Sequence, residues 1–111
     1  MVTRNPRLTR GDVWWAELDP PVGRRPVILV SRQSGYRQRD LMLVVPTTRT
    51  FRRGAGQIVL GAEEGLRETC FANSETIATL AQSRLLNRAG ALSAEKIAAL
   101  DEALRYALDL D

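Results

Sequence analysis

Apolar and polar residues alternate in short blocks over most of the chain, and glycine or proline separates many of the blocks. Blocks rich in valine, isoleucine and aromatic residues are typical of β-strands, because such side chains pack well on a pleated surface. The first block is apolar on both faces at Val13, Trp14 and Trp15, which indicates a strand buried on two sides. The pattern predicts strands at residues 12–18, 26–31, 41–45 and 57–60, with loops at residues 32–40 and 61–68.

The pattern changes character after residue 68. Residues 69–80 are ambiguous, since alanine and glutamate permit a helix whereas Phe71, Ile77 and the threonines favour a strand, and we predict a strand. One helical turn is expected at residues 83–87, followed by an extended piece at residues 88–92. Ser93 is a good helix N-cap, and apolar residues recur after it at helical spacing, which predicts an amphipathic helix of about fifteen residues.

Several short strands followed by one terminal helix predict a mainly β protein of the α+β type, folded as a small, strongly curved barrel. A chain of 111 residues has room for one domain. Residues 1–10 show no periodicity and are expected to form a flexible basic lead before a single domain at residues 11–111. The longest apolar run, residues 41–45, is too short to cross a bilayer, and no signal-peptide pattern follows the first residues, so we expect a cytoplasmic protein.

The residue inventory excludes several kinds of chemistry. Histidine is absent, which excludes a serine–histidine triad, paired-histidine ribonuclease chemistry and histidine-bound metals. The single cysteine, Cys70, cannot form an internal disulfide or a thiolate cluster, and it is expected to be buried. We therefore expect no metal and no cofactor, and a chemistry carried by arginines, hydroxyls and carboxylates.

Positive charge is concentrated in the first half of the chain. Residues 1–53 hold eleven arginines against four acidic residues, whereas residues 54–111 have a net formal charge of −4. Arginine suits phosphate recognition because its planar guanidinium donates two parallel hydrogen bonds, so a polyanionic partner such as nucleic acid is indicated. An arginine-for-lysine preference of the whole genome would explain the composition equally well.

Two short segments could carry catalysis. Gly23-Arg24-Arg25-Pro26 places two arginines where a loop enters a strand, and Pro46-Thr47-Thr48-Arg49 places hydroxyls where the third predicted strand ends. If these strands are neighbours, an arginine and a hydroxyl could meet and stabilise negative charge on a phosphoryl transition state. The alternative is an ordinary surface arginine and a turn threonine.

Longer stretches resemble a known family. The run from Arg10-Gly11-Asp12-Val13-Trp14 through Gly23-Arg24-Arg25-Pro26 resembles the opening of the MazF/PemK family of toxin endoribonucleases. Val44-Val45-Pro46-Thr47-Thr48 is similar to that family's third-strand end, and the segment from Glu75 to Leu104 is similar to its closing strand and helix. The resemblance covers about residues 10–110, with the elements in the same order.

The resemblance implies a homodimeric, SH3-like barrel that cuts single-stranded RNA without a metal. Members use the RNA's own 2′-hydroxyl as nucleophile and leave a cyclic phosphate and a free 5′-hydroxyl. Arg25 would be the catalytic arginine and Thr48 its partner on the scissile phosphate. A small antitoxin with an acidic, disordered tail would be the protein partner. The expected RNA-binding residues are Trp15, Arg24, Ser31, Thr47, Glu75 and Thr76.

The chain departs from the family pattern at two places. The loop before Arg24 is shorter and lacks the usual Ser-Glu-Gln stretch, and Thr76 replaces a glutamine, so base preference does not carry over. Trp15 could belong to the core or stack on a base, and Glu75 could accept from a base or be a solvated charge. Two other functions stay open: a gyrase inhibitor resembling the CcdB poisons, which share this barrel but lack the Arg-Pro and Pro-x-Thr pairing, and an RNA-binding barrel with weakened catalysis.

Overall fold

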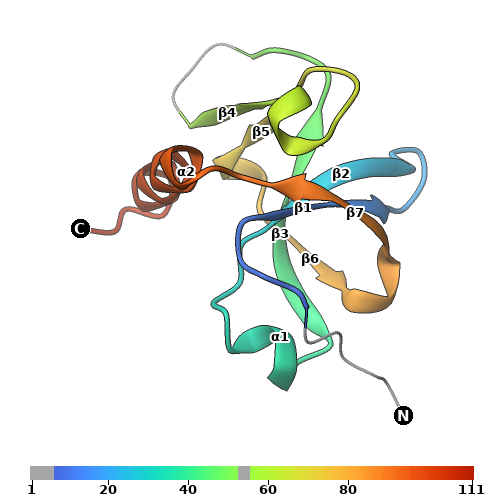
Figure 1. The fold of residues 1–111 in the computed structure, drawn as a ribbon. Coiled ribbons are helices and arrows are strands. Elements are labelled where there is room, and N and C mark those ends of the chain that lie inside the picture. The colour runs from blue at the N-terminus through green and yellow to red at the C-terminus, as the bar shows by residue number, and fades with distance from the viewer. Residues whose placement is uncertain (1–6, 53–55) are drawn as a thin grey trace.

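The computed structural model describes residues 7–52 and 56–111. Within these residues the chain forms one antiparallel sheet of seven strands and ends in a long helix, α2 (Figure 1). The strands are β1 (Asp12–Glu17), β2 (Arg24–Leu29), β3 (Leu41–Thr48), β4 (Gln57–Leu60), β5 (Cys70–Asn73), β6 (Ala78–Ala81) and β7 (Leu85–Ala91). Hydrogen-bonded neighbours follow the order β4-β5-β3-β2-β1-β7, and β6 also pairs with β3.

The sheet curls around β3, the longest strand. One edge of β3 pairs with β2, whereas its other edge pairs with β6 over residues 41–44 and with β5 at residues 47 and 48. Pro46 lacks a donor N–H, and it lies where this edge changes partner, so the missing donor interrupts no ladder. The result is a curled half-barrel with a C-terminal helix, which confirms the predicted fold class (Figure 1).

Both faces of the central strands are buried, as the apolar block in β1 predicts. Val13, Ile28 and Val45 belong to one core cluster, whereas Ala16, Val27 and Val44 belong to a second cluster on the other face. The two tryptophans follow the same alternation: Trp15 packs against the first cluster and Trp14 against the second.

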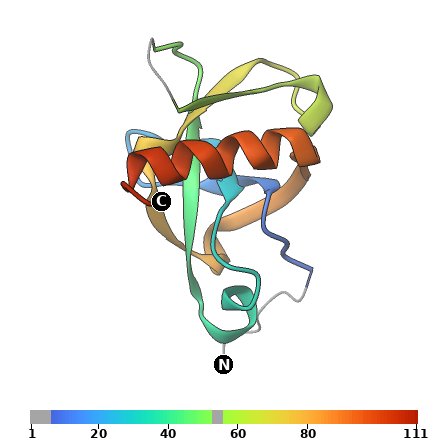
Figure 2. The same cartoon turned by 90° about the vertical axis from the view of Figure 1, so that its left-hand side faces the viewer.

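Helix α2 (Ala94–Ala107) begins at its predicted N-cap. The Ser93 hydroxyl accepts a hydrogen bond from the Lys96 N–H, and Leu100 is fully buried in the first core cluster. The helix contacts β4 and the 3₁₀ turn η2 (Ser74–Thr76), and it runs across the front of the sheet in Figure 2.

The prediction of a single strand at residues 69–80 is wrong at the centre of this range. The chain leaves β5 through η2 before it enters β6. The Asn73 side chain accepts from the Glu75 N–H, and the Thr76 hydroxyl donates to the Asn73 carbonyl. Such local side-chain bonds stabilise a turn and compete with a continuous ladder.

Other boundaries also differ from the sequence-based expectation. The loop predicted at residues 32–40 contains one helical turn, α1 (Gly35–Gln38), and β3 continues through Thr48. A 3₁₀ turn, η3 (Gln82–Arg84), replaces the turn expected at residues 83–87, and β7 starts at Leu85.

The predicted N-terminal lead falls largely outside the described residues. Within the described part, Leu8 is buried in the second core cluster. The Arg10 guanidinium lies 2.9 Å from the Asp101 carboxylate of α2. Residues 8–10 therefore pack with the domain.

Candidate active site

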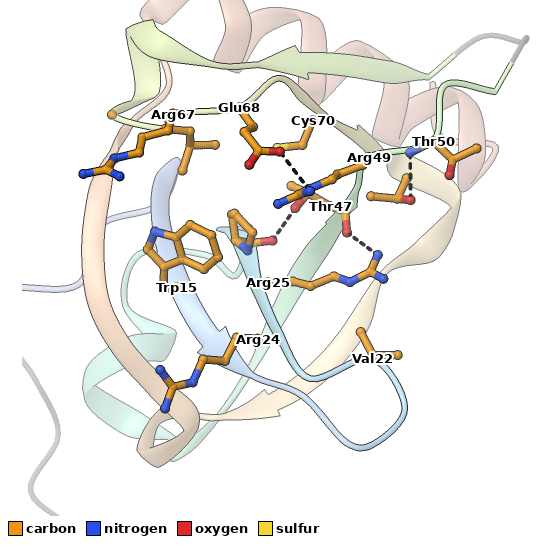
Figure 3. Close-up of a pocket in the computed structure, with 14 residues that line it drawn as sticks. Trp15, Val22, Arg24, Arg25, Thr47, Arg49, Thr50, Arg67, Glu68 and Cys70 are labelled. Carbon is orange, nitrogen blue, oxygen red and sulfur yellow. Dashed lines mark hydrogen bonds and ion pairs between the residues drawn. The ribbon is translucent and has the colours of Figure 1, made fainter.

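The ladder between β2 and β3 brings the two predicted catalytic residues together. Val27 pairs with Pro46 and Ile28 with Val45, and the same antiparallel register, continued by two residues, sets Arg25 opposite Thr48. Residues directly opposite on antiparallel strands share one face, with Cβ atoms about 5 Å apart. The Arg25 guanidinium is held near this point, because its Nη1 donates to the Thr47 carbonyl over 3.2 Å (Figure 3).

Arg25 and Thr48 line a pocket with a volume of about 580 Å³ (Figure 3). This volume lies within the range of about 300–1,000 Å³ that is usual for sites binding small ligands. Strands β1 and β2, the end of β3, and the loop between the 3₁₀ turn η1 (Ala62–Glu64) and β5 supply the walls. The lining residues are Trp15, Val22, Arg24, Arg25, Pro26, Thr47, Thr48, Arg49, Thr50, Gly65, Leu66, Arg67, Glu68 and Cys70.

The two threonines at the end of β3 have different surroundings. The Thr47 side chain is buried, and its hydroxyl donates to the Pro26 carbonyl over 2.8 Å, which ties β3 to β2 beneath Arg25. Thr48 is half-buried, and its hydroxyl oxygen accepts from the Thr50 N–H over 3.2 Å. The hydroxyl proton of Thr48 is therefore available to a ligand oxygen.

Arg24 and Trp15 lie at the edge of the same pocket. Arg24 is exposed, and its Nε donates to the Glu17 carboxylate of β1 over 3.2 Å. Trp15 is half-buried, packs against the first core cluster and also lines the pocket. The indole therefore belongs to the core through one part of its surface and to the pocket through another.

Three predicted RNA-binding residues are not among those that line this pocket. Ser31 follows the end of β2, and its hydroxyl oxygen accepts from the Leu43 N–H over 2.7 Å. Glu75 and Thr76 lie in η2, on the edge of β3 that faces away from β2, and both are exposed. Their role in RNA binding stays a prediction.

Sequence reasoning missed the wall formed by the loop between η1 and β5. Its position depends on Glu64, a buried carboxylate whose Oε1 accepts from the Gly61 N–H and whose Oε2 accepts from Lys96 Nζ of α2 over 2.8 Å. The loop also lies directly against β7: Gly65 has φ +81°, and a Cβ there would collide with the Ala89 carbonyl. The carboxylate and the glycine fix where Leu66, Arg67 and Glu68 lie.

The pocket offers cationic and hydroxyl groups and no activated thiol. Burial raises the pKa of the Cys70 thiol above its ordinary value, more than the Thr47 hydrogen bond lowers it, so the thiol stays protonated at neutral pH. Among the described residues, no three histidine, cysteine or acidic side chains are grouped to hold a metal ion. Arginine and threonine donors can stabilise oxygens that gain negative charge during a phosphoryl reaction.

A curled half-barrel whose pocket is lined by four arginines and by the Thr48 hydroxyl defines a small β protein suited to binding phosphate groups. Residues 9–108 match the family of PemK-like, MazF-like toxins of type II toxin–antitoxin systems. The chain belongs to this family, which covers nearly all of its length.

Similar proteins extend this result. The chain is 36% identical over 115 residues to endoribonuclease MazF9 of Mycobacterium tuberculosis, covering 93% of this chain and 98% of that protein. Its fold matches the M. tuberculosis toxin MazF-mt6 with a TM-score of 0.81 and 28% identity, covering 90% of this chain and 98% of the other. A mycobacterial endoribonuclease in complex with its cognate antitoxin matches with a TM-score of 0.82 and 26% identity, over 94% and 97% of the two chains.

A helix that crosses a membrane must be long and continuously apolar, and α2 is the longest helix of the described residues. In the parts of the chain that the structure describes, no helix is both long enough and apolar enough to cross a membrane.

Proposed function

We propose that this toxin is an endoribonuclease that cleaves single-stranded RNA by attack of the RNA's own 2′-hydroxyl, with Arg25 and Thr48 as catalytic residues and no metal. The observation that carries the proposal is that Arg25, at the start of β2, and Thr48, at the end of the neighbouring strand β3, line one pocket with three further arginines. Relatives named as endoribonucleases over nearly the whole chain support it. The family and the presence of the Arg-Pro and Pro-x-Thr segments argue against a gyrase inhibitor of the CcdB type.

The reaction is a transesterification. The 2′-oxygen gives its proton to solvent and bonds to the adjacent phosphorus. The bond from phosphorus to the 5′-oxygen breaks, and that oxygen takes a proton from solvent. The products are a 2′,3′-cyclic phosphate and a 5′-hydroxyl end. Negative charge grows on the non-bridging oxygens at the transition state, where the Arg25 guanidinium and the Thr48 hydroxyl donate hydrogen bonds. Arg25 acts by stabilising this charge, because its guanidinium donates charge-assisted hydrogen bonds to the phosphoryl oxygens.

Charge and exposed apolar surface support the partners that we propose. Leu41 and Leu43 of β3 are 58% and 46% exposed, and a second copy of the chain would cover them. The toxin is therefore a homodimer, and the arginine-rich segments of both copies attract single-stranded RNA in the cytoplasm. A mycobacterial endoribonuclease of the same fold forms a complex with its cognate antitoxin, which supports an antitoxin as the protein partner here. This antitoxin binds through an acidic, disordered tail that competes with RNA for the positively charged surface.

Cleavage of a long RNA in the presence of EDTA tests this proposal. The purified toxin should cut at a limited set of sites, and the fragments should carry cyclic phosphate and 5′-hydroxyl ends. Loss of activity in EDTA with recovery in Mg²⁺ or Mn²⁺ would contradict the proposal and indicate a metal-dependent nuclease. An intact RNA together with inhibited gyrase would favour the CcdB-type alternative.

A further inference from the structure

The pocket contains more arginines than the catalytic step needs. Among the described residues that line it are four arginines and one acidic residue, Glu68. Arg25 donates to the Thr47 carbonyl and Arg24 to Glu17, so both have protein acceptors. The other two arginines come from the wall that follows β3 and η1: Arg49 directly follows β3, and Arg67 lies in the loop between η1 and β5.

That wall is formed by the end of β3 and the loop between η1 and β5. The Arg49 guanidinium lies 2.9 Å from the Glu68 carboxylate, and their side chains are 75% and 61% exposed. Arg67, the neighbour of Glu68, is exposed and has no interaction with another part of the described chain. Figure 3 shows Arg67 at the edge of the pocket away from Arg25.

We propose that Arg67 and Arg49 form a second phosphate subsite, which binds a phosphodiester group next to the scissile one in single-stranded RNA. This inference rests on the proposed function. Glu68 holds Arg49 in the free protein, and the RNA phosphate replaces Glu68 when the strand enters. Trp15 lines the same pocket, in which the nucleoside joining the two phosphates would sit.

The exchange of Glu68 for phosphate costs little. An exposed ion pair contributes between about 0 and 1 kcal/mol, because water screens both charges. An arginine fork binds a phosphate through two charge-assisted hydrogen bonds, which are stronger than neutral ones. Glu68 therefore keeps the arginine extended toward the pocket without competing strongly for it.

The wall is also anchored, which favours a built binding site over a loose basic loop. Glu64 and Lys96 tie η1 to α2, and Gly65 packs against the backbone of β7 at Ala89. The side chain of Arg67 is exposed, whereas the contacts of Glu64 and Gly65 hold the backbone beside it at the pocket. Less ordering is then required when the strand binds.

Binding of an uncleavable RNA tests the subsite separately from catalysis. A fluorescent, fully 2′-O-methylated oligonucleotide keeps every phosphate and removes the nucleophile. Its affinity is measured by anisotropy over a series of salt concentrations for wild type, Arg67→Ala, Arg49→Ala and Glu68→Gln. Arg37→Ala is the matched control, because Arg37 is an exposed arginine on α1, at the far end of the molecule from η1 (Figure 1).

The subsite predicts a distinct pattern. Arg67→Ala and Arg49→Ala each weaken binding about fivefold to tenfold and lower the salt slope by about 0.7, the contribution of one phosphate contact in a single strand. Glu68→Gln tightens binding about twofold to threefold, since it removes the competing carboxylate. Arg37→Ala should leave both the affinity and the salt slope close to their wild-type values, because this charge is remote from the pocket.

Replacement of single phosphodiesters by neutral methylphosphonates shows which phosphate contacts the subsite. Once wild type has been used to map a cleavage site, a methylphosphonate is placed in turn at each phosphodiester around it. One position next to the scissile phosphate should weaken binding to wild type and have no further effect on Arg67→Ala. Equal affinities for Arg67→Ala and Arg37→Ala would overturn the subsite even if wild type cleaves RNA. Failure of wild type to cleave, with the variant pattern intact, would overturn the proposed function and leave the subsite supported.

Discussion

Removal of the Lys96 ammonium group should destabilise the fold more than its position on the helix surface suggests. Glu64 is 1% exposed, and its carboxylate has two donors, the Gly61 N–H and Lys96 Nζ. Lys96→Met leaves the buried carboxylate with one donor and also frees the Val59 carbonyl. Loss of one partner from a fully buried ion pair costs about 3–5 kcal/mol.

The expected loss of stability is smaller here, because one partner of the ion pair is partly exposed to water. The Lys96 side chain is 27% exposed, so solvent can approach Glu64 once the ammonium is gone. We therefore expect a loss of about 2–3 kcal/mol in the free energy of unfolding. For a domain of this size, the melting temperature should fall by roughly 10 °C. Urea denaturation followed by circular dichroism measures the free energy, and a thermal scan measures the shift.

A double variant separates charge from packing. Lys96→Met combined with Glu64→Gln replaces the stranded carboxylate by a neutral amide, and it should recover at least about 1 kcal/mol relative to Lys96→Met alone. A Lys96→Met protein within about 0.5 kcal/mol of wild type would refute the reasoning, since that is the size of an ordinary surface substitution. A double variant less stable than the single one would refute the role of the charge.

The pH dependence of the same pair follows from its pKa. Burial lowers the pKa of Lys96, but the hydrogen bond and charge of Glu64 and the charge of Glu63 outweigh it, so the pKa is raised above the ordinary 10.5. A raised folded-state pKa means that the stabilisation is complete below the unfolded pKa and is lost as the pH rises through the folded one. The difference in stability between wild type and Lys96→Met should therefore be constant near neutral pH and shrink above pH 10.5.

Three further predictions concern the pocket, the loop and the assembly. Thr48→Val keeps the shape and removes the hydroxyl, so the rate of RNA cleavage should fall about tenfold with unchanged stability, and an unchanged rate would exclude Thr48 from catalysis. Gly65→Ala should lower the free energy of unfolding by about 2–4 kcal/mol, as measured by urea denaturation. Gly23 also has positive φ, but no atom lies within 4 Å of the added Cβ, so Gly23→Ala should lower it by about 1 kcal/mol. Equal losses would disprove the backbone contact at Ala89. Light scattering should give twice the chain mass of 12.4 kDa, and a mass of 12.4 kDa at micromolar concentration would contradict the dimer.

The parts of the fold that depend on local patterns could be predicted from the sequence. β4 matches its predicted range, and α2 starts at the Ser93 cap because apolar spacing and capping are properties of a few neighbouring residues. Helix α1 could not be predicted in this way. Its carbonyls at Tyr36 and Arg39 are satisfied by the Gln82 side chain, 46 residues beyond Tyr36, and no local pattern records that bond.

The same distinction between local and long-range contacts applies to the residues of the site. Arg25 lies at the start of β2 and Thr48 at the end of β3, and these consecutive strands pair directly, so short-range reasoning was enough to propose that the two residues lie close together. Arg67 and Glu68 reach the same pocket only because Glu64 binds Lys96 and Gly65 lies against Ala89, which are contacts between distant segments. Only Arg49 carried a sequence signal, since it directly follows Thr48.

The cleavage rate of Arg25→Ala relative to wild type, measured on one mapped RNA site in EDTA, tests the central claim most directly. An oxyanion-type donor contributes about 3–4 kcal/mol to the transition state, so the account predicts a rate lower by about 100- to 1,000-fold. The unfolding free energy should stay close to that of wild type, because the side chain is only half-buried at the start of β2. Equal cleavage rates for Arg25→Ala and wild type would contradict the account.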